Sequence, residues 1–182
     1  MMHAPGGVHG FLRAYYHHKS ADWAGNTPHP LKAWTAEELA KLPTYYVMDL
    51  DKTMPETVAA EAPTPNEIAT NAWLPENELQ VYSTEFERTG FQGGLQWYRC
   101  AISPEFQAEL TLFSGRSIDV PSTFISGASD WEIYQRPGAL EAMQSKACTN
   151  LRFCTFVEGA GHWVQQEQPE IVTELLLGFL VR

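Results

Sequence analysis

The sequence has 182 residues, the size of one ordinary domain, and its 44% apolar residues provide enough material for a packed core. Twelve Lys and Arg against 22 Asp and Glu give a net charge of −10, which repels nucleic acid and anionic membrane surfaces. The longest apolar run, 175–181, is much shorter than the roughly 20 residues that a membrane span needs. These features predict a globular chain that binds no nucleic acid and has no membrane span.

The first thirty residues contain no basic and apolar segment with a small-residue cleavage site, so the sequence predicts no secretory signal and a cytoplasmic protein. Cys100, Cys148 and Cys154 form an odd set without a C-x-x-C pair, which predicts reduced thiols rather than disulfides or a zinc site. We expect neither a cofactor nor a bound metal.

The first third of the chain predicts short helices separated by loops. A helix is expected over 11–18, and Thr35 with Glu38 has the spacing of a capping box at the start of another. Prolines then recur and should interrupt any long helix, which predicts an irregular loop over 43–65 that wraps a surface; they are Pro43, Pro55, Pro63 and Pro65.

A longer helix is expected between Pro75, which suits a first helical turn, and Gly90, which suits a helix end. Apolar residues repeat between them at helical spacing. They are Leu79, Tyr82 and Phe86.

Composition changes near residue 115, where apolar runs typical of strands appear. Strands are expected over 120–127 and 151–157, each followed by a helix, over 137–145 and 169–180. This order predicts an α/β protein with a parallel βαβ unit. The chain is thus divided into a helical region with irregular loops, 1–114, and a βαβα region, 115–182.

Ligands of parallel sheets bind beyond the carboxyl ends of the strands, and the polar residues there are Asp130 and His162. A carboxylate that hydrogen-bonds an imidazole can fix its tautomer while the other ring nitrogen acts as a general base. The order, acid then histidine, agrees with that of α/β-hydrolases. The alternative is that Asp130 caps the next helix and the backbone satisfies His162.

Three motifs resemble one family. The run 90–99 (GFQGGLQWYR) resembles the end of the cap in epoxide hydrolases of the α/β-hydrolase fold, Gly161-His162-Trp163 resembles their histidine motif, and 126–130 (SGASD) resembles their acid motif. The resemblance covers 75–182 well. It implies a partial α/β-hydrolase fold, in which a helical cap (1–114) precedes the last two βα units of the core (115–182).

The resemblance also implies a two-step mechanism. An aspartate opens the epoxide to an ester, and water activated by histidine hydrolyses the ester to a diol. It assigns His162 as the base, Asp130 as its orienting acid and Tyr98 as a cap tyrosine that donates to the epoxide oxygen. The second cap tyrosine stays open among Tyr15, Tyr16, Tyr45 and Tyr46. Tryptophans beside these residues could line an apolar substrate pocket or only pack the core; they are Trp97, Trp131 and Trp163.

The sequence offers no clear nucleophile. It has no G-x-S-x-G, and Asp22 in Ser20–Gly25 follows the polar, helix-like run 13–19 instead of an apolar strand. Asp22 is therefore expected to be a surface or cap residue. We expect the chain to correspond to the cap and last βα units of a larger hydrolase, to lack activity alone, and to need the missing N-terminal half or self-association to cover its two strands.

Two other functions remain open. The chain could be a non-catalytic module that binds an apolar ligand or a partner through its tryptophans. It could also be a related dehalogenase, which would use halide-binding donors in place of Tyr98. The cap motif favours a small, apolar epoxide as substrate.

Overall fold

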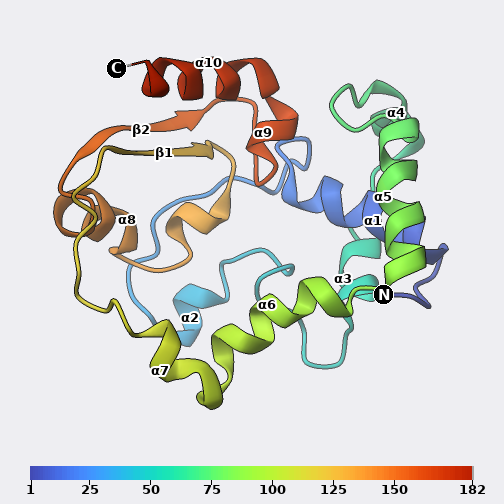
Figure 1. Ribbon diagram of the computed structural model, residues 1–182. Helices are drawn as coiled ribbons and strands as arrows, with labels where there is room; N and C mark the ends of the chain where they lie inside the picture. The colour runs from blue at the N-terminus through green and yellow to red at the C-terminus, as the bar shows by residue number, and fades with distance from the viewer. Residues whose placement is uncertain (182) are drawn as a thin grey trace.

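The computed structural model describes residues 1–181 and contains a helical part followed by a two-stranded sheet with its helices (Figure 1). The helical part consists of α1 (Gly7–Lys19), α2 (Ala36–Leu39), α3 (Met54–Ala59), α4 (Pro65–Thr70), α5 (Glu76–Thr89), α6 (Gln92–Ile102), a 3₁₀ turn (Pro104–Phe106) and α7 (Gln107–Leu110). The rest consists of β1 (Ser122–Gly127), a 3₁₀ turn (Trp131–Tyr134), α8 (Ala139–Ala142), a π-helical turn (Met143–Ala147), β2 (Leu151–Val157), α9 (Val164–Glu167) and α10 (Pro169–Leu180).

The sheet confirms the predicted α/β arrangement. β1 and β2 are parallel, with Ser122 opposite Leu151 at one end and Gly127 opposite Val157 at the other. α10 lies along one side of the sheet (Figure 1). β2 has the predicted bounds, whereas β1 begins two residues later than predicted, because Pro121 has no N–H to donate to the ladder.

The main apolar core lies where α1 packs against α3 and α5. Phe11 and Leu12 of α1 are buried there with Val58 and Leu79. Arg13 fixes the helix further, since its guanidinium donates to the Leu74 carbonyl at 2.7 Å and to the Glu76 carboxylate at 2.8 Å. The helix predicted over 11–18 is longer than expected, since it begins at Gly7 and ends at Lys19.

The expectation of an irregular loop over 43–65 was wrong in part. α3 forms inside this stretch, with a reciprocal capping box between Thr53 and Glu56. Pro55 lies in its first turn, where the missing N–H costs no hydrogen bond, so this proline begins a helix instead of interrupting one. At α2 the predicted cap is only half formed, because the Glu38 carboxylate accepts from the Lys32 N–H instead of the Thr35 N–H.

The helix predicted between Pro75 and Gly90 is confirmed as α5, and Gly90 has a φ of 70°, which favours glycine. The helix predicted over 137–145 is split into the short α8 and the π-helical turn that follows it. Within residues 1–181, none of the helices combines the length and the apolar character that crossing a bilayer would require.

Large apolar side chains remain exposed on α6, around α7 and on α10. Trp97 is 79% exposed and Ile102 80%, while Leu112 and Phe113 after α7 are 71% and 66% exposed. In Figure 1, α6 runs toward α7. The exposed apolar side chains are therefore concentrated on a few helices.

The loops after the two strands approach each other at two glycines. A Cβ on Gly127 would lie 2.2 Å from the Gly161 carbonyl oxygen, and a Cβ on Gly161 would lie 2.7 Å from the Lys19 carbonyl oxygen. Both neighbours are backbone atoms, which cannot rotate away. Gly127 and Gly161 therefore allow the end of β1, the loop after β2 and the end of α1 to pack together.

We expect Gly127→Ala to lower the free energy of unfolding by roughly 1–3 kcal/mol, because the added methyl group overlaps backbone. The matched control is Gly178→Ala in α10, where an added Cβ meets nothing within 4 Å. This control should be neutral or gain up to about 1 kcal/mol from helix propensity. Urea unfolding of the variants measures both effects, and equal stability of the two would contradict the close approach.

His18 is a fully buried imidazole near the end of α1. Its ring lies edge-on to Trp23 and Tyr45, with centroid distances of 4.4 and 4.8 Å. Neither ring nitrogen has a hydrogen-bond partner among the described residues, and burial lowers the pKa of His18 to about 4. The folded chain therefore holds this imidazole neutral at pH values where the unfolded chain protonates it.

The buried His18 should make the fold sensitive to mild acid. As pH falls from 6.5 toward 4, only the unfolded state binds this proton, so the free energy of unfolding should decrease by up to about 1.4 kcal/mol per pH unit. Chemical denaturation at several pH values measures this slope. His18→Phe, which fills the site without a titratable group, should make the slope shallower in this range; an unchanged slope would contradict the prediction.

Candidate active site

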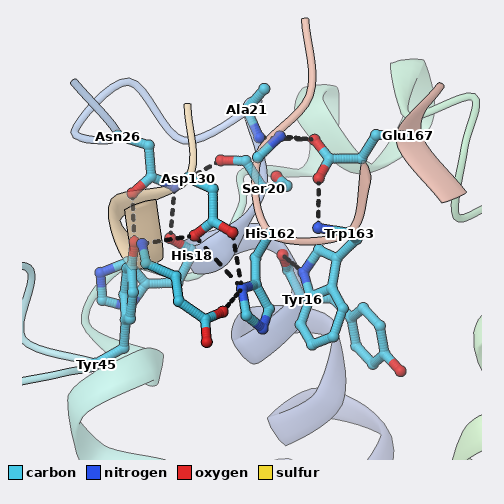
Figure 2. Close-up of polar contacts among 12 residues, drawn as sticks. Tyr16, His18, Ser20, Ala21, Asn26, Tyr45, Asp130, His162, Trp163 and Glu167 are labelled. Atoms are coloured by element: carbon cyan, nitrogen blue, oxygen red, sulfur yellow. Dashed lines mark hydrogen bonds and ion pairs between the residues drawn. The ribbon is translucent and has the colours of Figure 1, made fainter. Parts of the chain in front are cut away.

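The two polar residues that follow the strands lie together. His162 Nδ1 is 3.3 and 3.4 Å from the two carboxylate oxygens of Asp130 (Figure 2). Asp130 is 6% exposed, whereas the His162 side chain is 24% exposed. Asp130 also accepts the Glu132 N–H at 3.0 Å, so it caps the 3₁₀ turn and contacts the imidazole at the same time. The two readings that the sequence left open for Asp130 are therefore compatible.

The backbone around His162 is held by α1 and by a buried carboxylate. The His162 N–H donates to the Lys19 carbonyl at 2.9 Å. Glu167 accepts N–H groups from Ala21, Gly161 and Trp163 at 2.8 to 3.0 Å (Figure 2). Burial raises the pKa of Glu167. Glu167 was not predicted from the sequence, where its only signal is that an acidic residue lies one helical turn after a histidine motif.

A second carboxylate reaches the same ring nitrogen. Glu132 Oε2 lies 3.4 Å from His162 Nδ1, and the Glu132 side chain is 60% exposed. Oxygen and nitrogen atoms of Asp130, Glu132 and His162 all lie within 4.8 Å of one another. Glu132 was not predicted from the sequence either, although its position two residues after Asp130 suggested that it could lie near the same histidine.

Lys19 places a cation close to this cluster. Its ammonium lies 5.0 to 5.8 Å from the ring centroids of four aromatic residues: Tyr15, Tyr45, Tyr46 and Trp163. The side chain is buried, which lowers the pKa of Lys19, while the charges of Asp130 and Glu132 act in the opposite direction. The aromatic faces and the two carboxylates together compensate for the burial of this charge.

A cleft of about 410 Å³ opens beside the histidine. Its polar residues are Ser126, Asp130, Glu132 and His162. Most of the remaining lining is apolar and comes from β1, the turn after it, α8 and its π-helical extension: Phe124, Ile125, Ile133, Leu140 and Met143. A small apolar molecule could therefore bind with its reacting bond at the polar group.

The other predicted site residues lie in different surroundings. Trp131 is 3% exposed and packs with Leu31 and Leu42, so it occupies the core and not the cleft lining. Trp163 is half-buried and donates its indole N–H to the Tyr16 carbonyl at 2.9 Å. Trp97 and Tyr98, on α6, are 79% and 64% exposed.

The tyrosines that could accompany Tyr98 are distinguished by their neighbours. The Tyr45 hydroxyl donates to the Asn26 side chain at 2.6 Å. The pKa of Tyr16 is raised to about 12, by burial first and then by Tyr82. The pKa of Tyr15 is raised to about 12, by burial first and then by Tyr98.

Within residues 1–181, neither strand leads to a nucleophile elbow, since the loops after β1 and β2 carry Asp130 and His162. Asp22 is exposed and accepts hydrogen bonds from Asn71 at 3.0 Å and from the Trp73 indole at 2.8 Å. Its carboxylate thus ties the loop after α1 to the segment before α5, as expected of a surface residue.

Comparison with known proteins finds relatives that are longer than this chain, and each match covers only part of the relative. The chain is 40% identical over 110 residues to epoxide hydrolase A of Mycobacterium tuberculosis, a match that covers 60% of this chain and 32% of the relative. It is 36% identical over 133 residues to an epoxide hydrolase of Caballeronia sordidicola, covering 72% and 37%. No family model matches the sequence. The chain therefore spans about a third of the length of these curated relatives.

Solved structures agree with the sequence matches. An epoxide hydrolase from an endophytic Streptomyces superimposes with a TM-score of 0.69 at 31% identity, covering 96% of this chain and 46% of that one. Potato (Solanum tuberosum) epoxide hydrolase I superimposes with a TM-score of 0.55 at 34% identity, covering 67% and 38%. By sequence and by structure, the chain is homologous to part of the epoxide hydrolases of the α/β-hydrolase fold.

Proposed function

We propose that this chain supplies the acid and histidine half of an epoxide hydrolase active site, with His162 as the general base and Asp130 as its orienting acid. The observation that carries the proposal is the contact of His162 Nδ1 with the Asp130 carboxylate at the ends of adjacent parallel strands. In this proposal residues 1–114 form the cap region, and residues 115–182 form the C-terminal part of the hydrolase core.

The first step is attack on the epoxide by a carboxylate. One carboxylate oxygen bonds to a ring carbon, the carbon–oxygen bond of the epoxide breaks, and the alkoxide that forms takes a proton from a phenol of the cap. Tyr98 is the phenol proposed from the sequence. Tyr15 is our candidate for the second, because it is half-buried and its pKa is raised by burial first and then by Tyr98.

The second step is hydrolysis of the ester. With Nδ1 directed at Asp130, the Nε2 atom of His162 can take a proton from water as the hydroxide adds to the ester carbonyl. When the adduct breaks down, the diol oxygen leaves and takes that proton, which regenerates the neutral imidazole. The carboxylic acid that remains then loses its proton, and this proton restores the phenol that was ionised in the first step. Asp130 stabilises the imidazolium that exists between these events.

The nucleophile is proposed to come from hydrolase sequence outside residues 1–182. The short match to each relative supports this, since the chain corresponds to less than half of the solved structures. The exposed apolar residues of α6 and α10 also support it, because further hydrolase structure packed on them would remove that surface from water.

The apolar cleft favours a small hydrophobic epoxide as substrate. Its lining supplies hydrocarbon from β1 and α8, while the polar groups gather at His162. Trp97 and Trp163 are proposed to extend this apolar surface, and Trp131 to support it from the core.

The function is tested with the chain alone and with the chain joined to the N-terminal half of a relative such as epoxide hydrolase A of Mycobacterium tuberculosis. We expect no diol from styrene oxide with the chain alone, and diol with the joined protein. In the joined protein, His162→Gln should lower diol release by about 10²- to 10⁴-fold and leave the ester on the protein, where intact-protein mass spectrometry detects it.

The matched control is His3→Gln, an exposed histidine outside the site, which should leave turnover unchanged. Full turnover of the joined His162→Gln protein would contradict the assigned base. Turnover of the chain alone would contradict an external nucleophile.

The roles of the phenols are tested in the same joined protein. Tyr98→Phe and Tyr15→Phe should each slow ester formation by about 10²-fold, because each removes one donor to the developing alkoxide. Tyr16→Phe is the control, since the neighbouring hydroxyls of Tyr16 are those of Tyr82 and Tyr15. Stopped-flow fluorescence during a single turnover measures the step, and equal effects of Tyr15→Phe and Tyr16→Phe would contradict the choice of Tyr15.

A further inference from the structure

His162 has one ring nitrogen in contact with two carboxylates. Nδ1 lies 3.3 Å from Asp130 Oδ2 and 3.4 Å from Glu132 Oε2. Charge-assisted hydrogen bonds between nitrogen and carboxylate usually measure about 2.7–2.9 Å. Neither contact is therefore a tight bond. Only the Asp130 contacts have hydrogen-bond geometry, and Glu132 Oε2 is a further carboxylate oxygen at nearly the same distance from Nδ1.

We propose that Glu132 is a second positioning residue for His162, which keeps the proton on Nδ1 together with Asp130 and can keep it there when the Asp130 carboxylate is removed. The inference deepens the proposed function and rests on it only for its consequence in turnover. The contacts among Asp130, Glu132 and His162 support the inference whether or not the chain takes part in turnover.

The backbone places Glu132 by means of Asp130. Asp130 Oδ1 accepts the Glu132 N–H at 3.0 Å, which fixes the 3₁₀ turn in which Glu132 lies. The same carboxylate thus contacts the imidazole and holds the turn that presents the second acid. The spacing of two residues is what places Glu132 beside Asp130.

The two carboxylates differ in burial, which divides their roles. The Asp130 side chain is 8% exposed and that of Glu132 60% exposed, so solvent screens Glu132 more strongly. Asp130 should therefore dominate the interaction in the unaltered protein. Two carboxylates at one nitrogen also repel each other, and the buried ammonium of Lys19, whose pKa both carboxylates act to raise, reduces that cost.

The cleft explains why a second acid would matter at this position. Asp130, Glu132 and His162 all line it, so a substrate that enters displaces water beside Glu132. Removing water strengthens the attraction between Glu132 and an imidazolium. The second carboxylate would then act most strongly while the site is occupied.

The test follows the tautomer of His162 by ¹⁵N NMR of ring-labelled protein, using the chain alone at a pH where the imidazole is neutral. In Asp130→Asn the amide oxygen can still accept the Glu132 N–H. The amide N–H then points toward Nδ1, which favours the Nε2–H tautomer of His162. We expect Asp130→Asn to retain a substantial Nδ1–H population because Glu132 accepts that proton. The double variant Asp130→Asn/Glu132→Gln should shift to Nε2–H.

Glu132→Gln alone should keep the Nδ1–H form, and Glu141→Gln, at an exposed glutamate of α8, serves as the control for loss of one surface charge. Circular dichroism of each variant shows whether the fold is retained. The inference is overturned if Asp130→Asn alone shifts the ring as completely as the double variant, or if the double variant keeps Nδ1–H. Because the readout needs no substrate, a failed turnover assay leaves this result unaffected.

Discussion

The parallel pairing of β1 and β2 is the constraint on which the rest of the candidate site depends. Parallel strands end at the same edge of a sheet, so the loops that follow Gly127 and Val157 begin side by side. Two glycines then let these loops pack against backbone at the end of α1. The contact of Asp130 with His162 is a consequence of this register, because a shift of either strand would separate the two side chains.

The same constraint explains what the sequence could predict. The strands, the helix between Pro75 and Gly90 and the positions of Asp130 and His162 depend on local patterns, and the structure agrees with them. Glu132 follows from the same local turn and could have been found. Glu167 was harder to find, because its contact with the Ala21 N–H joins residues 146 positions apart in the sequence. α3 was missed because prolines were read as interruptions, although Pro55 is compatible with a first turn.

The surroundings of Lys19 are a second feature that no sequence pattern predicts. The four aromatic rings near its ammonium come from α1, from the loop after α2 and from the loop that carries His162. Only the ring on α1 is close to Lys19 in the sequence. Its carbonyl accepts the His162 N–H, and its ammonium lies in the field of Asp130 and Glu132, so one residue contributes both backbone and charge to the surroundings of His162. The end of α1 is therefore part of the site and more than a scaffold.

The distribution of apolar surface supports the proposal that further hydrolase structure completes the site. The acid and histidine lie in a well-packed region, with Asp130 and Glu167 both buried. By contrast, α6, which carries Tyr98, has no buried residue and exposes Trp97 and Ile102. A phenol that donates to a substrate oxygen must be held within hydrogen-bond distance, and an uncovered helix does not hold it so closely. In the proposed function, further structure packed against α6 would therefore hold Tyr98 more firmly.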